Sequence, residues 1–120
     1  MGRLTAGLAW GDITPPVGIP LGGFAARFHP SQGIHDRLYA KALTLADGDR
    51  TVALVATDLL AVPRRIVEGV RDLVQAKTGI GKEHLTITAT HTHSGPETTG
   101  IAAEEDDRHI ASYLNPLELD

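Results

Sequence analysis

The chain has 120 residues, 42% of them hydrophobic and 22% charged, which is ordinary globular composition for one domain. A formal net charge of −4, with lysines and arginines scattered rather than clustered, argues against a nucleic-acid partner. There is no cysteine, which excludes disulfides, thiolate metal sites and a cysteine nucleophile. The sequence shows no apolar run long enough for a transmembrane segment and no signal peptide, so the cytoplasm is the default expectation.

The first half of the sequence predicts an antiparallel arrangement. Residues 3–10 can form a strand, and the proline- and glycine-rich stretch 12–23 excludes a helix or a central strand. Residues 37–46 alternate between two faces, as a strand does, and residues 47–50 carry the Asp-Gly signal of a hairpin turn. The apolar run 51–57 is typical of a buried central strand, and we expect it to pair antiparallel with 37–46.

The second half predicts a crossover connection. Apolar residues recur at helical spacing over 63–78, with Pro63 suited to the first turn and Gly79 to the C-terminal cap. The strand that follows, 85–90, should lie parallel to the preceding one. The expected fold class is therefore α/β, a mixed sheet with an antiparallel hairpin and a β-α-β crossover. In that geometry Asp58 and His91 reach the same edge of the sheet.

The most informative segment is 85–96, LTITATHTHSGP, an apolar strand that runs into two histidines. If the chain stays extended, His91 and His93 lie on the same side. The carboxyl edge of an α/β sheet is where ligands bind, and neutral imidazole is a common zinc ligand. We therefore favour contact with a metal or a substrate over an incidental pair of exposed histidines. The turn residues Ser94 to Pro96 favour a turn over a serine nucleophile.

Other polar and aromatic residues carry weaker signals. The cluster 33–37 is more simply explained by a turn in which Arg37 pairs with a carboxylate. Asp58 is either a buried hydrogen-bonded group or a carboxylate that orients a histidine. Trp10 is expected to anchor the core, and the acidic run 104–107 to form a solvated loop or a first helical turn. Three further histidines are expected to face solvent: His29, His84 and His109.

Five motifs in order then establish a resemblance. They are GDIT at 11–14, LGGF at 21–24, GIHDRLYAKAL at 33–43, TDLL at 57–60 and ATHTHSGP at 89–96. Together they resemble the N-terminal part of the neutral/alkaline non-lysosomal ceramidase family, over Ala6 to Gly100. Members of that family are zinc amidases that cleave the N-acyl bond of ceramide to give sphingosine and a fatty acid.

The resemblance implies a role for each matching residue. His91 would be a zinc ligand, and Asp58 would support the site. Gly23, His35 and His93 would lie in the catalytic pocket against the substrate, with His93 and His35 able to donate to the developing oxyanion. The implied chemistry is Lewis-acid activation of an amide carbonyl by zinc.

The resemblance also implies an incomplete site. The family's remaining zinc ligands and its nucleophilic serine would follow residue 120, and Glu97-Thr98-Thr99 replaces the glycines and aromatic usual after the histidine motif. We expect residues 1–120 to be a truncated N-terminal segment of the catalytic domain, inactive alone, with a lipid or other N-acyl substrate. Exposed strand edges should promote self-association. The alternatives are a non-catalytic module that binds a metal or small ligand through His91, His93 and His35, and a zinc hydrolase of another amide or ester.

Overall fold

The structure is a computed structural model and describes residues 3–100. In chain order the elements are β1 (Thr5–Asp12), β2 (Tyr39–Asp47), β3 (Arg50–Thr57), α1 (Arg64–Thr78), the short 3-10 helix η1 (Lys82–His84) and β4 (Leu85–Ala89). The acidic run 104–107 and His109 lie outside the described residues. Within the described part, no helix has the length and apolar character needed to cross a membrane.

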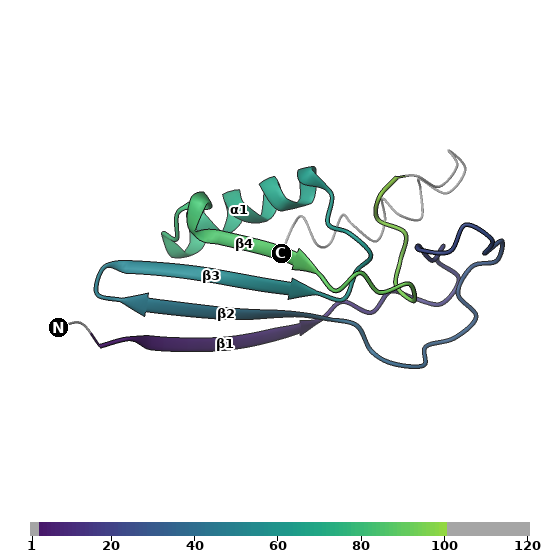
Figure 1. The fold of residues 1–120 in the computed structure, drawn as a ribbon, viewed down its shortest axis with the longest axis horizontal. Coiled ribbons are helices and arrows are strands. Elements are labelled where there is room, and N and C mark those ends of the chain that lie inside the picture. Colours follow the sequence, from purple (N-terminus) through teal and green to yellow (C-terminus); the bar gives the residue numbers. More distant parts are fainter. Residues whose placement is uncertain (1–2, 101–120) are drawn as a thin grey trace.

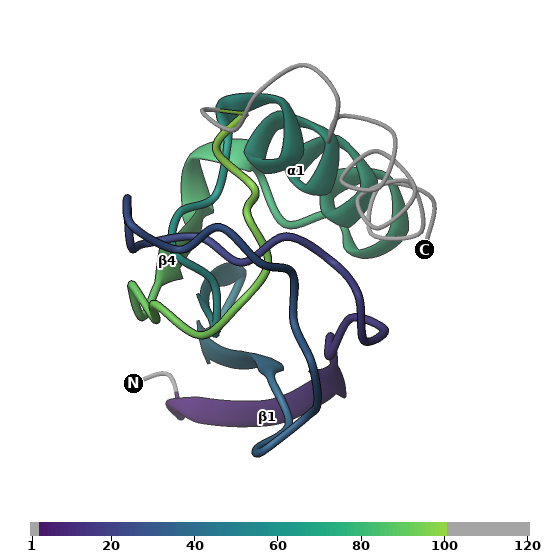
Figure 2. The same cartoon turned by 90° about the vertical axis from the view of Figure 1, so that its right-hand side faces the viewer.

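The strands form one mixed sheet in the order β1-β2-β3-β4. β1, β2 and β3 are antiparallel neighbours, whereas β3 and β4 are parallel and are connected through α1. Figure 1 shows α1 alongside β4, and Figure 2 shows it well away from β1 at the other side of the sheet. The predicted fold class, a hairpin joined to a β-α-β crossover, is confirmed.

Local signals in the sequence determine the turns and helix ends. Asp47 pairs with Arg50, so the hairpin loop has two residues, and Gly48 takes the positive φ of 59° that suits its first position. Pro63 directly precedes α1, and Gly79 ends it in the left-handed conformation with φ 77°. The predicted bounds of both the hairpin and the helix are thus confirmed within one or two residues.

The helix covers one face of the sheet at β3 and β4, whereas every residue of β1 is exposed. Alternate residues of β3 and β4 on that face are buried or half-buried, with Ala53 and Leu85 buried, and Ile66 of α1 is buried as well. Arg71 of α1 also donates hydrogen bonds to the carbonyl oxygen of Leu85, from Nη2 at 3.0 Å and from Nε at 3.3 Å. These contacts hold α1 against the start of β4.

The other face of the sheet is open, and two predictions about it are wrong. Trp10 is 72% exposed rather than buried in a core, and the run 51–57 is buried on one side only, because Val52 and Leu54 are exposed. The strand register places an apolar set on this face, hereafter the open face: Ala6, Leu8, Trp10, Leu43, Leu45, Val52 and Leu54. Both segments do form strands, as their residue types predict. Burial of a strand also requires a second layer of structure over its side chains, and α1 provides that layer only on the opposite face of the sheet.

The loops gather at one end of the sheet. β1, β3 and β4 all end there, β2 begins there, and the connections 13–38, 58–63 and 90–100 lie beyond these strand ends (Figure 1). This is the carboxyl edge at which the sequence placed Asp58 and His91. The candidate site is built from these three connections.

Candidate functional site at the carboxyl edge of the sheet

Parallel pairing continues past the end of β4 and positions His91. Thr90 N donates to the Thr57 carbonyl at 2.9 Å, and His91 N donates to the Leu59 carbonyl at 3.0 Å. The strand itself ends at Ala89, and His91 has φ 63°, a left-handed conformation that is uncommon outside glycine. The expectation of an extended chain through His93 is therefore wrong, because the backbone turns at His91.

The His91 side chain has a defined tautomer. Its Nδ1 lies 2.9 Å from the Leu60 carbonyl oxygen. A carbonyl oxygen only accepts, so Nδ1 carries the proton and the lone pair of the neutral ring lies on Nε2. Histidines that bind metals usually donate their second ring N–H to a carbonyl or carboxylate in this way. The exposed His91 ring thus fits the requirements of one zinc ligand.

His93 lies next to His91 despite the turn. The two ring centroids are 5.0 Å apart with the planes at 75°, and the Phe24 ring packs on His93 at 4.9 Å and 77°. Both are edge-to-face arrangements, which are favourable for aromatic rings. The prediction that the two imidazoles share one side is met in space, although by a turn and not by strand alternation.

Gly23 forms the wall beside His93. Its φ is 105°, and a Cβ atom there would lie 2.8 Å from both Cβ and Nδ1 of His93 and closer still to Cγ. A side chain at position 23 would therefore occupy the space of the imidazole. The structure brings Gly23, His91 and His93 together. A catalytic pocket at Gly23 and His93 stays a prediction of the family resemblance.

The two loops that carry these residues are joined by backbone hydrogen bonds. Leu21 and Pro96 form an isolated antiparallel bridge, in which Gly22 N donates to the Gly95 carbonyl at 3.1 Å. Glu97 N donates to the Pro20 carbonyl at 2.9 Å. The loop after the histidines is buried from Gly95 to Thr98, so the two imidazoles are followed directly by a packed segment.

Asp58 supports this edge through the backbone of β2. Its N–H donates to the Tyr39 carbonyl, and its Oδ2 accepts from the Tyr39 N–H, both at 2.9 Å. Of the two alternatives for Asp58, these bonds favour a hydrogen-bonded structural carboxylate over one that orients a histidine. Its effect on the site is to hold the start of β2 against the end of β3.

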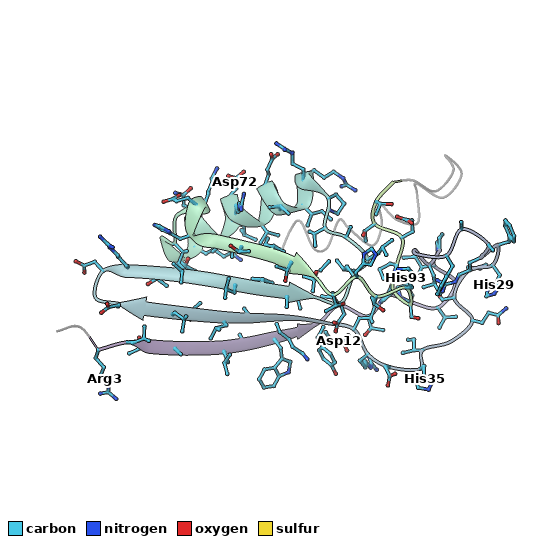
Figure 3. All side chains as sticks on the ribbon, viewed as in Figure 1. Arg3, Asp12, His29, His35, Asp72 and His93 are labelled. Carbon is cyan, nitrogen blue, oxygen red and sulfur yellow. The ribbon has the colours of Figure 1, made fainter. Side chains whose placement is uncertain are left out.

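His35 is not brought to the pocket. Its side chain is 97% exposed, and its Nδ1 lies 2.7 Å from Oδ2 of Asp36. Figure 3 shows it on an outer loop, apart from His93. Arg37 in the same segment pairs with Asp12 at 2.9 Å, which confirms the simpler explanation of that arginine. A place for His35 in the pocket stays a prediction that requires this loop to move.

The pairing of His35 with Asp36 has a measurable consequence. The hydrogen bond that His35 donates to the Asp36 carboxylate, together with the charge of that carboxylate, raises the pKa of His35 above the usual value. We expect Asp36→Asn to lower that pKa, as followed by the NMR titration of the His35 ring. Because the pKa is raised in the folded state, the pair stabilises the fold below the unfolded pKa near 6.5, and this is lost as pH rises through the folded value. An unchanged titration in Asp36→Asn would contradict the contact.

Two residues at the site were missed by sequence reasoning. Arg27 donates to the His93 carbonyl from Nη2 at 2.7 Å, and no local pattern connects positions 27 and 93. Glu97 is only 8% exposed, and its Oε1 accepts from the Thr99 backbone N–H at 2.6 Å and from the Thr99 hydroxyl. The only sequence signal for Glu97 was its departure from the family pattern.

The described residues do not complete a metal centre. Among residues 3–100, no cluster of three or more histidine or carboxylate side chains is placed to hold a metal ion. His91 therefore fits as one ligand of a set whose other members are not in this part of the chain.

The geometry defines an α/β protein whose histidine pair lies at the carboxyl edge of a mixed sheet. Residues 4–103 match the family model described as neutral/alkaline non-lysosomal ceramidase, N-terminal. The chain belongs to this family, as its N-terminal, ceramidase-like portion.

Individual relatives agree with this membership. The neutral ceramidases of Drosophila melanogaster and Drosophila pseudoobscura pseudoobscura are each 35% identical over 95 residues, which is 75% of this chain and 13% of the relative. The crystal structure of neutral ceramidase from Pseudomonas aeruginosa superposes with a TM-score of 0.70 at 29% identity, over 82% of this chain and 16% of that one. A structure of ceramidase complexed with C2 gives the same values. The chain thus spans about a sixth or less of these relatives.

Proposed function

We propose that this chain provides the N-terminal part of the active site of a zinc-dependent amidohydrolase that cleaves the N-acyl bond of ceramide or a related lipid. The observation that carries the proposal is the His91 tautomer: Nδ1 is bonded to the Leu60 carbonyl, and Nε2 is left for a metal next to His93. Family membership supports the same reaction class.

Each residue has a distinct part in this proposal. A zinc ion bound through His91 would polarise the amide carbonyl as a Lewis acid. His93 would donate a hydrogen bond to the carbonyl oxygen as negative charge develops on it, and Gly23 leaves the room that its ring needs. His35 would be a second donor only if its loop turned from Asp36 toward His93. Asp58 holds the strand ends on which these residues are mounted.

The proposal includes a dependence on further residues. One imidazole is a quarter of the usual ligand set of a zinc site, so the described part of the chain is expected to bind zinc weakly and to be inactive alone. The remaining ligands would come from outside residues 3–100.

The test uses the chain alone and a chimera. In the chimera, residues 4–103 replace the aligned segment of Drosophila melanogaster neutral ceramidase. We expect the chimera to contain about one zinc per chain by elemental analysis and to release fatty acid from ceramide. His91→Ala should remove the zinc and lower hydrolysis by more than about 100-fold. His84→Ala, which changes an exposed histidine on η1, is the matched control and should retain both.

Each result discriminates among the alternatives. A His91→Ala chimera that keeps its zinc and its activity would refute the role of His91. Near-equimolar zinc in the 120-residue chain, lost in His91→Ala without any hydrolysis, would favour the non-catalytic binding module. If the chimera hydrolyses other amides or esters but not ceramide, the result would support a zinc hydrolase with a different substrate.

A further inference from the structure

Arg27 occupies a position between the two loops that form the site. Its backbone N–H donates to the Phe24 carbonyl at 3.1 Å, which closes a turn directly after the LGGF motif. The turn folds the arginine back over the motif, with Cζ 4.9 Å from the centre of the Phe24 ring. The half-buried guanidinium is thereby directed toward the histidine loop.

The guanidinium joins the two loops directly. Nη2 donates to the His93 carbonyl at 2.7 Å, and Nη1 donates to the Gly22 carbonyl at 3.2 Å. Hydrogen bonds from a charged donor are stronger than neutral ones, and both of these are partly buried. The backbone of His93 is therefore held by a residue from the opposite loop.

The ring of His93 is held from the same side. Phe24 lies under the guanidinium and packs edge-to-face on the imidazole at 4.9 Å, while the backbone of Gly23 closes the space beside it. Arg27 thus acts on His93 twice, through its carbonyl oxygen and through the Phe24 ring.

We propose that Arg27 is the positioning residue of His93, which fixes the imidazole beside His91 at the orientation needed to reach a substrate carbonyl. This inference rests on the proposed function, in which His93 donates to the developing oxyanion. A lysine at position 27 is not expected to position His93 in the same way. Its single ammonium cannot donate to both carbonyl oxygens in the geometry of the guanidinium fork while also lying over the Phe24 ring.

The test measures the position of His93 in the 120-residue chain by NMR, with histidines and phenylalanines isotopically labelled. In the wild type we expect a nuclear Overhauser effect between the Phe24 and His93 rings, and a His93 Cε1 proton shifted by the ring current of Phe24. Arg27→Lys should abolish the Overhauser effect. It should also move the Cε1 proton toward its position in Phe24→Leu, which lacks the aromatic ring.

Arg71→Lys is the matched control. Arg71 also donates twice from a partly buried guanidinium to backbone, at the Leu85 carbonyl, but at the opposite end of the sheet. We expect it to destabilise the chain without changing the His93 signals. An unchanged Overhauser effect in Arg27→Lys, or an equal loss in Arg71→Lys, would overturn the inference.

The NMR signals of His93 depend on neither zinc nor hydrolysis, so the positioning role of Arg27 can be refuted independently of the proposed function. In the active chimera, Arg27→Lys should lower kcat about 10-fold or more with KM nearly unchanged, since a displaced donor weakens the transition state in particular. If Arg27→Lys abolishes the Overhauser effect but kcat is unchanged, Arg27 does position His93. The same result would refute the proposed catalytic role of His93.

Discussion

Replacing Gly23 with alanine is expected to lower the midpoint of thermal unfolding by more than about 10 °C and to displace His93 from its place beside His91. Two effects combine. An alanine at φ 105° is strained, and its Cβ would lie 2.8 Å from Cβ and Nδ1 of His93. Backbone strain and overpacking each cost about 1–3 kcal/mol, so we estimate a loss of about 3 kcal/mol in the free energy of unfolding.

Gly18→Ala separates these two effects. Gly18 has a similar φ of 97°, but a Cβ there would have no atom within 4 Å, so only the backbone strain remains. Gly33→Ala has open space and no positive φ, and should be nearly neutral. Unfolding followed by circular dichroism gives the three stabilities. Equal losses for Gly23→Ala and Gly18→Ala would contradict a tight contact between Gly23 and His93.

A double-mutant cycle checks that the contact is with His93. In a His93→Ala background the imidazole is gone, so Gly23→Ala should cost measurably less than it does in the wild type. Some cost should remain, because the Cβ of residue 93 also approaches position 23. Additive losses would show that the cost of a side chain at position 23 does not depend on the imidazole ring.

The parts of the fold that sequence could predict are those fixed by local chemistry. Gly48 marks the hairpin, Pro63 and Gly79 mark the helix ends, and each acts through residues within one turn of itself. The crossover then placed Asp58 and His91 at one edge, because successive parallel strands end on the same side of a sheet.

The failures involve partners distant in sequence. Trp10 and Leu54 have the composition of core residues, yet burial depends on which layer covers each face of the sheet. The turn at His91 depends on pairing with Leu59, and the hold of Arg27 on His93 joins residues 66 positions apart. Such contacts form only when distant segments meet at the carboxyl edge of the sheet, so the hydrophobic periodicity of the sequence does not predict them. The family resemblance did associate Gly23 with His93, which lie in close contact, because a resemblance brings long-range information that periodicity lacks.

The open face should make the 120-residue chain associate with itself, and charges placed on it should suppress this. Leu8, Leu43 and Leu54 lie in one row across β1, β2 and β3, with Leu8 78% and Leu54 47% exposed. Three strands of this length present about 400 Å², the size at which an apolar patch favours a partner. We expect Leu8→Lys/Leu54→Lys to raise the concentration at which association begins, measured by sedimentation velocity, by about 10-fold or more.

Phe28→Ser distinguishes the open face from general hydrophobicity. Phe28 is 92% exposed but lies in the loop between β1 and β2, away from the sheet, so its loss should leave association unchanged. If Phe28→Ser suppresses self-association to the same extent as Leu8→Lys/Leu54→Lys, the open face is not the specific site of self-association. In the chimera, by contrast, we expect the lysine pair to reduce folding and activity, because there the same face would pack against the rest of the enzyme. A chimera that tolerates both lysines would show that the open face is not packed against the rest of the chimeric enzyme.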